Sequence, residues 1–351
     1  MDIHEATRLY EAWTRRHIDV IASDLRLKHE RMAESTFVFL RATFYRWLQH
    51  WPEVCPDLLK APRVLAVGDL HVENFGTWRD REGRLIWGID DVDEACRLPY
   101  TQDLVRLATS ALLAIRAGHF TVSSADACDA ILTGYAASIE LGGQPVVLAE
   151  RHGWLREMAL NERRDPAVFW ARLNALPTAR GPAPHDALRS LMPERTLRYR
   201  VVRRVAGVGS LGRPRWVALA DWGSGLIARE AKAVLPSAAG WLRPHAANPI
   251  DGAALLKRAV RVPDPFFAIR RSWIVRRLAP DCTRIELNAL PKKRDELKLL
   301  HAMGWETANL HLGTPHARIA QDLKSRRRRW LARGASGMVA ALTRDWHEWR
   351  R

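Results

Sequence analysis

The chain has 351 residues, of which 47% are hydrophobic and 27% are charged, and its formal net charge is +16 at pH 7. This size and composition predict one large or two ordinary folded domains and exclude a disordered chain. The longest apolar stretch, near LATSALLAI, is far shorter than the roughly 20 residues that a membrane helix requires, and the first residues lack a signal-peptide core. We therefore expect a soluble, cytoplasmic protein that does not associate with a membrane.

The first 60 residues predict helices, because HIDVIASDLRLKHERMA and STFVFLRATFYRWLQHW carry apolar residues at helical spacing. Two short apolar runs follow, RVLAVGD and RLIWGIDD, and each predicts a buried strand that ends in acidic residues. The sequence DREG predicts a turn that separates these two strands. Two further helices are expected over TQDLVRLATSALLAIRA (residues 101–117) and SSADACDAILTGYAASIEL.

The predicted secondary structure changes in the second half of the chain. Residues 142–197 predict loops and helices, whereas residues 198–290 predict a small β-rich region from LRYRVVRRVAGVGS, PRWVALADW, SGLIAREAKAV and SWIVRRLA. The remainder is expected to be helical. Because strands and helices are segregated, the sequence predicts an α+β fold, divided into residues 1–197, 198–290 and 291–351.

The strongest functional pattern is acidic and follows the two predicted strands. In GDLHVENFG, Asp69 comes directly after a strand and is followed by Asn74, while IDDVDEA contains Asp90 and Asp91. Clustered carboxylates are costly unless they are paired, hydrogen-bonded or bound to a metal. Phosphoryl transfer uses such a set, with one carboxylate to orient or deprotonate the attacking hydroxyl and hard oxygen ligands for Mg²⁺. We expect Asp69 in the first role and Asn74 and Asp91 in the second, although such residues are also common in turns.

GDLHVENFG resembles the GDxHxxN catalytic loop of aminoglycoside-phosphotransferase-like kinases, and Asp103 of QDLVRLA follows Asp91 at the distance found in that group. This resemblance implies a two-lobed, protein-kinase-like fold that binds ATP and Mg²⁺. It implies that Asp69 is the catalytic base, that Asn74 and Asp91 are magnesium ligands and that Asp103 is a structural anchor. His71 in such loops is more often structural than a metal ligand.

The chain is also similar to the bacterial family called domain of unknown function 2252. The similarity lies in FLRATF, GDLHVENFG, IDDVDEA, DLVRLATS, GVGSLG and ANLH, which together cover most of the length. That family is regarded as kinase-like in fold, with no settled substrate.

A second pattern, GVGSLG, places Gly207, Gly209, Ser210 and Gly212 between two predicted strands. A strand–glycine loop–strand unit is typical of the hairpin that covers the nucleotide in kinases, whereas a dinucleotide site requires a helix after the glycines. Taken alone, the loop could equally be an ordinary glycine-rich turn. We expect it to face the acidic pattern across one shared cleft.

The strand after the glycine loop, SGLIAREAKAV, supplies Arg229 and Lys232 as candidates for the cation that pairs with nucleotide phosphates. The family resemblance favours Arg229, which precedes Glu-Ala, while Lys232 shares a strand face with Glu230. The choice stays open, and both can be solvated strand residues. Kinases normally pair this cation with a glutamate from a helix, and here Glu230 and Glu286 are the only nearby candidates.

The order of these parts differs from that of ordinary kinases, in which the glycine loop and its lysine precede the catalytic loop. A circular permutation that places the small β-rich lobe after the catalytic strands explains the order. ELKLLHAMGWETANLHLG is then the helix behind the catalytic loop, with Leu297, Leu300, Gly304 and His311 on one buried face.

Other functions fit parts of the sequence. The same fold can transfer AMP, or bind a nucleotide without chemistry, and the sequence does not separate these from phosphoryl transfer to a small-molecule or protein hydroxyl. The net charge and KSRRRRWLARG (residues 324–334) fit a nucleic-acid partner or a solvated helix face. VGDLH resembles the opening of metallophosphoesterases, but the chain lacks the Asn-His dipeptide that this class requires. The four cysteines are far apart in sequence, so we expect free thiols.

Overall fold

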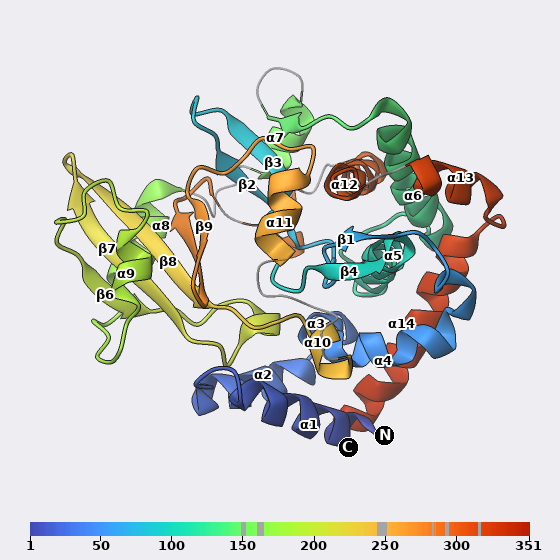
Figure 1. Ribbon diagram of the computed structural model, residues 1–351, viewed down its shortest axis with the longest axis horizontal. Coiled ribbons are helices and arrows are strands. Elements are labelled where there is room, and N and C mark those ends of the chain that lie inside the picture. Colours follow the sequence, from blue (N-terminus) through green and yellow to red (C-terminus); the bar gives the residue numbers. More distant parts are fainter. Residues whose placement is uncertain are drawn as a thin grey trace.

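The computed structural model describes residues 1–148, 152–159, 165–243, 251–282, 284, 286–291, 295–314 and 317–351. The fold is α+β, with helices and antiparallel sheets, as the sequence predicts. A five-stranded sheet lies on one side of the molecule, and most of the helices and two smaller sheets lie on the other (Figure 1). Both termini lie close together, where His4 Nε2 is 3.3 Å from the carbonyl oxygen of Glu348.

The N-terminal block consists of helices, as its apolar periodicity predicts. They are α1 (Ile3–Arg15), α2 (Ala22–Met32), α3 (Thr36–Ala42) and α4 (Phe44–Val54), followed by a short 3-10 turn, Pro56–Leu58. Asp2 and Ser35 cap α1 and α3, because their side chains accept hydrogen bonds from the backbone N–H groups of Glu5 and Val38.

The acidic residues follow strands of two different small sheets. β1 (Arg63–Ala66) pairs with β4 (Cys96–Pro99), whereas β2 (Phe75–Arg79), β3 (Leu85–Ile89) and β5 (Val146–Val147) form a three-stranded sheet. The predicted strands RVLAVGD and RLIWGIDD are therefore present as β1 and β3. The DREG turn, however, joins β2 to β3. The prediction overlooked β2 because FGTWR is buried on both faces and shows no apolar–polar alternation.

Helices α5 (Tyr100–Arg116), α6 (Ser124–Leu141), α12 (Glu296–His311) and α14 (Trp330–Trp349) pack around these small sheets. The backbones of α6 and α12 meet at two glycines. A Cβ on Gly134 would lie 1.9 Å from the carbonyl oxygen of His301, and a Cβ on Gly304 would lie 2.0 Å from that of Ile131. Only glycine permits this approach.

The predicted buried face of α12 is confirmed for Leu300, Gly304 and His311 but is wrong for Leu297, which is 39% exposed. The first turn of α12 directs Glu296 inward instead. Its carboxylate accepts hydrogen bonds from the backbone N–H groups of the loop before α6, which the apolar pattern did not indicate.

The five-stranded sheet has the order β6-β7-β8-β10-β9 and is antiparallel throughout. Its strands are β6 (Arg200–Arg203), β7 (Arg215–Trp222), β8 (Gly225–Ala233), β9 (Phe267–Arg270) and β10 (Trp273–Leu278). It lies within residues 198–290, where strands were expected; the division of the chain into three domains stays a prediction.

The register of this sheet decides which side chains share a face. Val202, Val217, Glu230 and Arg276 are directly opposite one another across four strands. Since side chains alternate along a strand, residues two positions away lie on the same face. We call this the cleft face; it carries Val202, Val217, Leu219, Ala228 and Leu278 at one end and Arg204, Arg215, Glu230, Lys232 and Arg276 at the other.

Two helices cover the sheet. α8 (Pro166–Asn174) packs on the apolar end of the cleft face, and α9 (His185–Arg189) packs on the opposite face (Figure 1). The remaining elements are α7 (Gly153–Ala159), α10 (Ala239–Leu242), α11 (Asp251–Arg258), α13 (Ala317–Ser325) and two 3-10 turns, Val208–Ser210 and Leu287–Ala289.

None of the helices in the described ranges is long and apolar enough to cross a membrane. The four cysteines are free thiols, as the sequence predicts. Cys55, Cys96 and Cys128 are buried, and Cys282 is partly buried.

Candidate functional site

A cleft of about 880 Å³ lies between the acidic loops and the cleft face of the five-stranded sheet. The acidic loops line it with residues that include Asp69, His71, Asn74, Asp90 and Asp91, and the glycine loop lines it with Gly207, Gly209 and Ser210. The structure therefore brings together two patterns that are far apart in the sequence, as the sequence predicts. Lys232 and Glu230 lie beneath this lining, on the cleft face.

Asp103 fixes the backbone that carries Asp69. Its fully buried carboxylate accepts hydrogen bonds from the backbone N–H groups of Val67 at 2.7 Å and Gly68 at 2.9 Å. His311 of α12 contacts the same carboxylate, with 3.0 Å between its Nε2 and Oδ2 of Asp103. Asp103 thus holds the loop in place from behind, the position expected of an anchor.

The side chain of Asp69 is paired with Arg106, a fully buried residue of α5. Nε of Arg106 donates to Oδ1 of Asp69 at 2.9 Å, and the guanidinium stacks on the Trp47 ring at 4.9 Å. Burial raises the pKa of Asp69 to about 7, and the charge of Arg106 offsets only part of this effect. A carboxyl group with that pKa exchanges its proton near neutral pH, which suits a general base.

Sequence reasoning missed Arg106, although DLVRLATS was among the motifs that carry the family resemblance. The signal was its spacing: Arg106 is three residues after Asp103 on α5, so both side chains lie on the same side of the helix. An arginine at this position can therefore contact the loop that Asp103 anchors.

Asn74 links the two acidic loops. Its side-chain Nδ2 donates to the backbone carbonyl of Asp69 at 3.0 Å and to that of Asp91 at 3.4 Å. Its backbone carbonyl accepts a hydrogen bond from the Asp90 N–H at 3.0 Å. Its Oδ1 accepts no hydrogen bond from any residue that the structure describes. Since the amide nitrogen is engaged, this oxygen is the atom left to bind a ligand.

Lys232 of β8 forms ion pairs with the acidic loop that follows β3. Its Nζ lies 3.4 Å from Oδ1 of Asp91 and forms a shorter ion pair with Asp93. Burial raises the pKa of Asp91, but the charge of Lys232 and a hydrogen bond with Asp93 outweigh burial and hold that pKa below its usual range. The side chain of Asp91 is 47% exposed and that of Lys232 only 5%. Asp91 is therefore an ionised carboxylate that reaches into the cleft.

Arg229, the other candidate cation, lies on the opposite face of β8. There its Nε donates to the carbonyl of Leu191 at 2.7 Å, and its guanidinium stacks on the Phe266 ring at 4.6 Å. It occupies that face because it is one residue from Glu230, and side chains alternate along a strand. The structure thus brings Lys232, and not Arg229, to the acidic loops.

Glu230 pairs with arginines rather than with Lys232, so the lysine–glutamate pair expected from kinases does not form between these two residues. Its fully buried carboxylate accepts hydrogen bonds from Arg204 at 2.7 Å, Arg215 at 2.7 Å and Arg276 at 3.0 Å. Burial raises the pKa of Glu230, but the three guanidinium groups outweigh it and hold that pKa well below its usual range. We call Arg204, Arg215 and Arg276 the arginine cradle; all three line the cleft with an excess of positive charge.

Arg276 also approaches Asp90, with 3.8 Å between its NH1 and Oδ2 of that carboxylate. Burial raises the pKa of Asp90 to about 6, although Arg276 works in the other direction. Asp90 thus ties the acidic loop after β3 to the cradle.

The glycine loop connects β6 to β7 and packs against the side of the cleft that carries the acidic loops. A Cβ on Gly209 would lie 2.7 Å from the carbonyl oxygen of Arg41 and 3.6 Å from Oδ2 of Asp69. Gly207 has a φ of +75°, a conformation that favours glycine. Close packing at Gly209 therefore brings the loop backbone next to Asp69.

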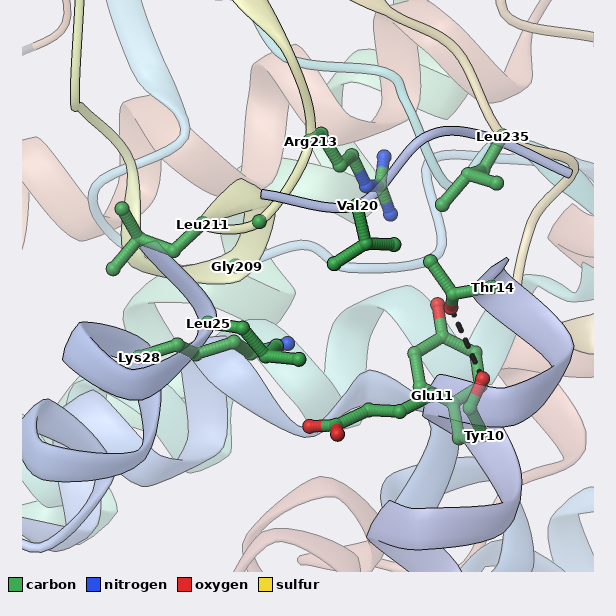
Figure 2. Close-up of a pocket in the computed structure, with 11 residues that line it drawn as sticks. Tyr10, Glu11, Thr14, Val20, Leu25, Lys28, Gly209, Leu211, Arg213 and Leu235 are labelled. Atoms are coloured by element: carbon green, nitrogen blue, oxygen red, sulfur yellow. Dashed lines mark hydrogen bonds between the residues drawn. The ribbon is translucent and has the colours of Figure 1, made fainter. Parts of the chain in front are cut away.

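Gly212, the last glycine of the pattern, faces away from the cleft. Its carbonyl accepts a hydrogen bond from the Ile21 N–H at 2.9 Å, which ties the loop to the start of α2. Behind the loop is a small cavity of about 20 Å³, into which Lys28 of α2 extends (Figure 2). Burial and the charge of Arg213 lower the pKa of Lys28 to about 8.

His71 has a structural role, as expected. Its Nδ1 accepts the backbone N–H of Glu73 at 3.2 Å, within the loop itself. Burial and the charge of Arg41 lower its pKa well below the usual range, so the imidazole is neutral at pH 7.

Within the described ranges, no three His, Cys, Asp or Glu side chains converge on a possible metal position. The candidate protein ligands for a divalent cation are therefore Oδ1 of Asn74 and the carboxylate of Asp91. Mg²⁺ is commonly bound by one or two carboxylates together with substrate phosphates and water. The residues thus fit a cation that arrives with phosphates better than a metal held by protein alone.

Residues 20–167 match the profile of a family described as "Uncharacterized protein conserved in bacteria (DUF2252)". The match includes FLRATF, GDLHVENFG, IDDVDEA and DLVRLATS, but it covers less than half of the chain and excludes GVGSLG and ANLH. It is thus shorter than the resemblance that the motifs suggest. No curated protein and no solved structure matches the chain.

Proposed function

We propose that this chain binds a magnesium–nucleoside triphosphate in the cleft and transfers its terminal phosphoryl group to a hydroxyl acceptor. In this proposal the protein is a kinase-like phosphotransferase whose order of parts is circularly permuted. The five-stranded sheet acts as the small lobe, and the helical side acts as the large lobe. One observation carries the proposal: Gly209 packs beside Asp69 in the cleft that Asn74 and Asp91 also line.

The charges along the cleft support these roles. Asp69, with a pKa of about 7, accepts the proton of the attacking hydroxyl. Oδ1 of Asn74 and the carboxylate of Asp91 hold the metal, and Mg²⁺, when bound, neutralises developing charge on the phosphates. The arginine cradle provides guanidinium donors suited to phosphate oxygens.

Lys232 has a further role in this proposal. Its ammonium forms ion pairs with Asp91 and Asp93. With a divalent cation on Asp91, the ammonium of Lys232 would be left to Asp93 and to phosphate oxygens. Lys232 would then take the place of the phosphate-binding lysine of kinases, with two aspartates instead of a helix glutamate as its partners.

Two alternatives use the same geometry, namely transfer of AMP and nucleotide binding without catalysis. Transfer of AMP requires attack on the α-phosphorus instead of the γ-phosphorus, and binding alone requires attack on neither, so the fate of an isotopic label separates all three. A nucleic-acid-binding role is a third alternative, with Arg327, Arg328 and Arg329 exposed before α14. That role requires neither Asp69 nor Asp91, and its affinity would fall steeply with salt.

The test is turnover of ATP labelled in its α- or γ-phosphate, with Mg²⁺, by the wild type, Asp69→Asn and Glu82→Gln. Glu82 is an exposed residue of the turn between β2 and β3, so Glu82→Gln controls for the change of charge. We expect the γ-label to appear on the acceptor and the α-label to stay in ADP. Asp69→Asn should keep the wild-type affinity for Mg-ATP but lose about 10²–10⁴-fold in turnover, while Glu82→Gln matches the wild type.

Equal turnover by Asp69→Asn and the wild type would contradict the role of Asp69. Transfer of the α-label to the acceptor, with the γ-label released as pyrophosphate, would favour nucleotidyl transfer. Binding of Mg-ATP without turnover in the wild type would favour a non-catalytic protein.

A further inference from the structure

The cleft face changes in character along β8. Ala228 lies in an apolar row with Leu219 and Leu278, Glu230 lies at the centre of the arginine cradle, and Lys232 reaches the acidic loops. These positions are two residues apart, so each step is about 7 Å along the strand. Along β8, the cleft face is therefore first apolar, then cationic, and then adjacent to the acidic loops.

The apolar end of this face is covered by α8. Phe169 and Leu173 of α8, with Leu176 just after the helix, pack with Val202 and Leu278 of the sheet. All of these except Val202 also line the cleft. The helix is fixed at its start by Asp165, whose side chain accepts the Val168 N–H at 3.0 Å.

Two apolar side chains that line this cleft are among the most exposed apolar residues of the described chain. Val168 of α8 is 48% exposed and Val205 of the glycine loop is 50% exposed, and both line the cleft. Exposed apolar side chains gathered in a cleft mark a site where an apolar ligand surface is covered.

Arg200, at this end of the cleft face, is committed to the protein. It donates from Nη1 to the carbonyl of Leu176 at 2.9 Å and from Nη2 to that of Asn174 at 2.8 Å. The apolar side chains of this wall therefore offer contact surface, and Arg172 of α8 is an exposed guanidinium beside them.

We infer that the apolar wall formed by Val168, Phe169, Val205 and Leu278 binds the base of the nucleotide, with Phe169 as its aromatic contact. This inference rests on the proposed function, because it takes the arginine cradle as the phosphate site. The order along β8 then matches the order along a nucleoside triphosphate: base, phosphates, and terminal phosphate beside the metal ligands.

The test compares Mg-ATP with Mg-tripolyphosphate, which carries the phosphates without a nucleoside. Calorimetry gives both dissociation constants for the wild type, Phe169→Ala, Val168→Asn and Trp222→Ala. Trp222 is 47% exposed on the same sheet but does not line the cleft, so it controls for loss of an aromatic ring.

We expect Phe169→Ala to weaken Mg-ATP binding about tenfold to a hundredfold, the range for losing an aromatic stack on a base. Val168→Asn, which alters an exposed side chain and leaves the packed ones intact, should weaken it several-fold. Both variants should bind Mg-tripolyphosphate as the wild type does, and Trp222→Ala should leave both affinities unchanged.

The inference is overturned if both variants bind Mg-ATP as tightly as the wild type, or if the wild type binds tripolyphosphate as tightly as ATP. It is also overturned if a folded Val168→Asn variant loses affinity for both ligands equally. Failure of the proposed function looks different, because the wild type then binds neither ligand.

Discussion

His311 lies 3.0 Å from Asp103, although 208 residues separate them in the chain. Through this contact α12, in the last quarter of the chain, supports the loop that carries Asp69, in the first quarter. Both side chains are fully buried. The contact makes the geometry of the candidate site depend on the packing of α12 against α5.

Asp103→Ala should therefore be strongly destabilising. The substitution leaves the backbone N–H groups of Val67 and Gly68 without their acceptor in a buried loop and removes the partner of His311. We expect the free energy of unfolding to fall by about 3–5 kcal/mol, as when one member of a buried charged network is removed. Denaturant unfolding measures this loss, and Asp57→Ala, at an exposed position, is the control. A loss below about 1 kcal/mol would mean that Asp103 does not hold the loop.

The pH dependence of turnover should follow Asp69. Burial raises its pKa to about 7, and a general base acts only when it is deprotonated. The rate at low substrate should therefore fall about tenfold per pH unit below 7 and level off above it. A rate that stays constant from pH 5 to pH 8 would show that Asp69 does not act as the base.

Gly68→Ala should destabilise the protein far more than the same substitution at Gly83, another glycine in the left-handed backbone conformation. Gly68 has a φ of +84°, and its Cβ would lie 2.3 Å from the carbonyl oxygen of Glu94. Gly83, in the β2–β3 turn, has a φ of +75° but nothing within 4 Å of its Cβ. Gly83→Ala should cost about 1 kcal/mol, the price of the left-handed conformation. Gly68→Ala should cost several kcal/mol more by thermal unfolding; equal costs would rule out the close contact with Glu94.

Lys28→Met should stabilise the protein at pH 7. The folded-state pKa of Lys28 is about 8 instead of 10.5, so folding disfavours its charged form. The cost is present in full below pH 8 and is removed as the pH rises from 8 to 10.5. We expect a gain of about 3 kcal/mol at most at pH 7, equivalent to that shift, and a smaller gain at pH 9.5.

Thermal unfolding at both pH values measures this effect, with the exposed Lys60→Met as the control. A destabilised Lys28→Met would indicate that attraction between the ammonium and carboxylates such as Glu11 outweighs the cost of burial.

The sequence predicted the parts of the fold that depend on local pattern. The helices α5 and α6, the strands β1 and β3, and the β6–glycine loop–β7 unit all follow from periodicity and turn residues. β2 was not predicted because FGTWR is buried on both faces. The prediction that Leu297 is buried was wrong because Glu296 points inward instead. Periodicity does not report burial of a carboxylate that bonds to a distant loop.

The candidate site was predictable where residues are adjacent to one another in sequence, as for Asp69, Asn74 and Asp91. The choice between Arg229 and Lys232 depended on strand register, which is fixed by pairing with β7 and β10 and is not encoded locally. Arg106 requires knowledge that α5 passes behind the loop. The arginine cradle joins three strands, so no single segment could reveal it.

Calorimetric titration of ATP into the wild type and Asp91→Ala, with Mg²⁺ present or chelated, asks whether this cleft is a magnesium–nucleotide site. The wild type should bind ATP tightly only with Mg²⁺, and Mg²⁺ alone should bind weakly because too few protein ligands converge. Asp91→Ala should lose at least about tenfold in affinity for Mg-ATP, which is about 1.4 kcal/mol. Binding that is equal with and without Mg²⁺, or equal in Asp91→Ala and the wild type, would contradict a magnesium–nucleotide site in this cleft.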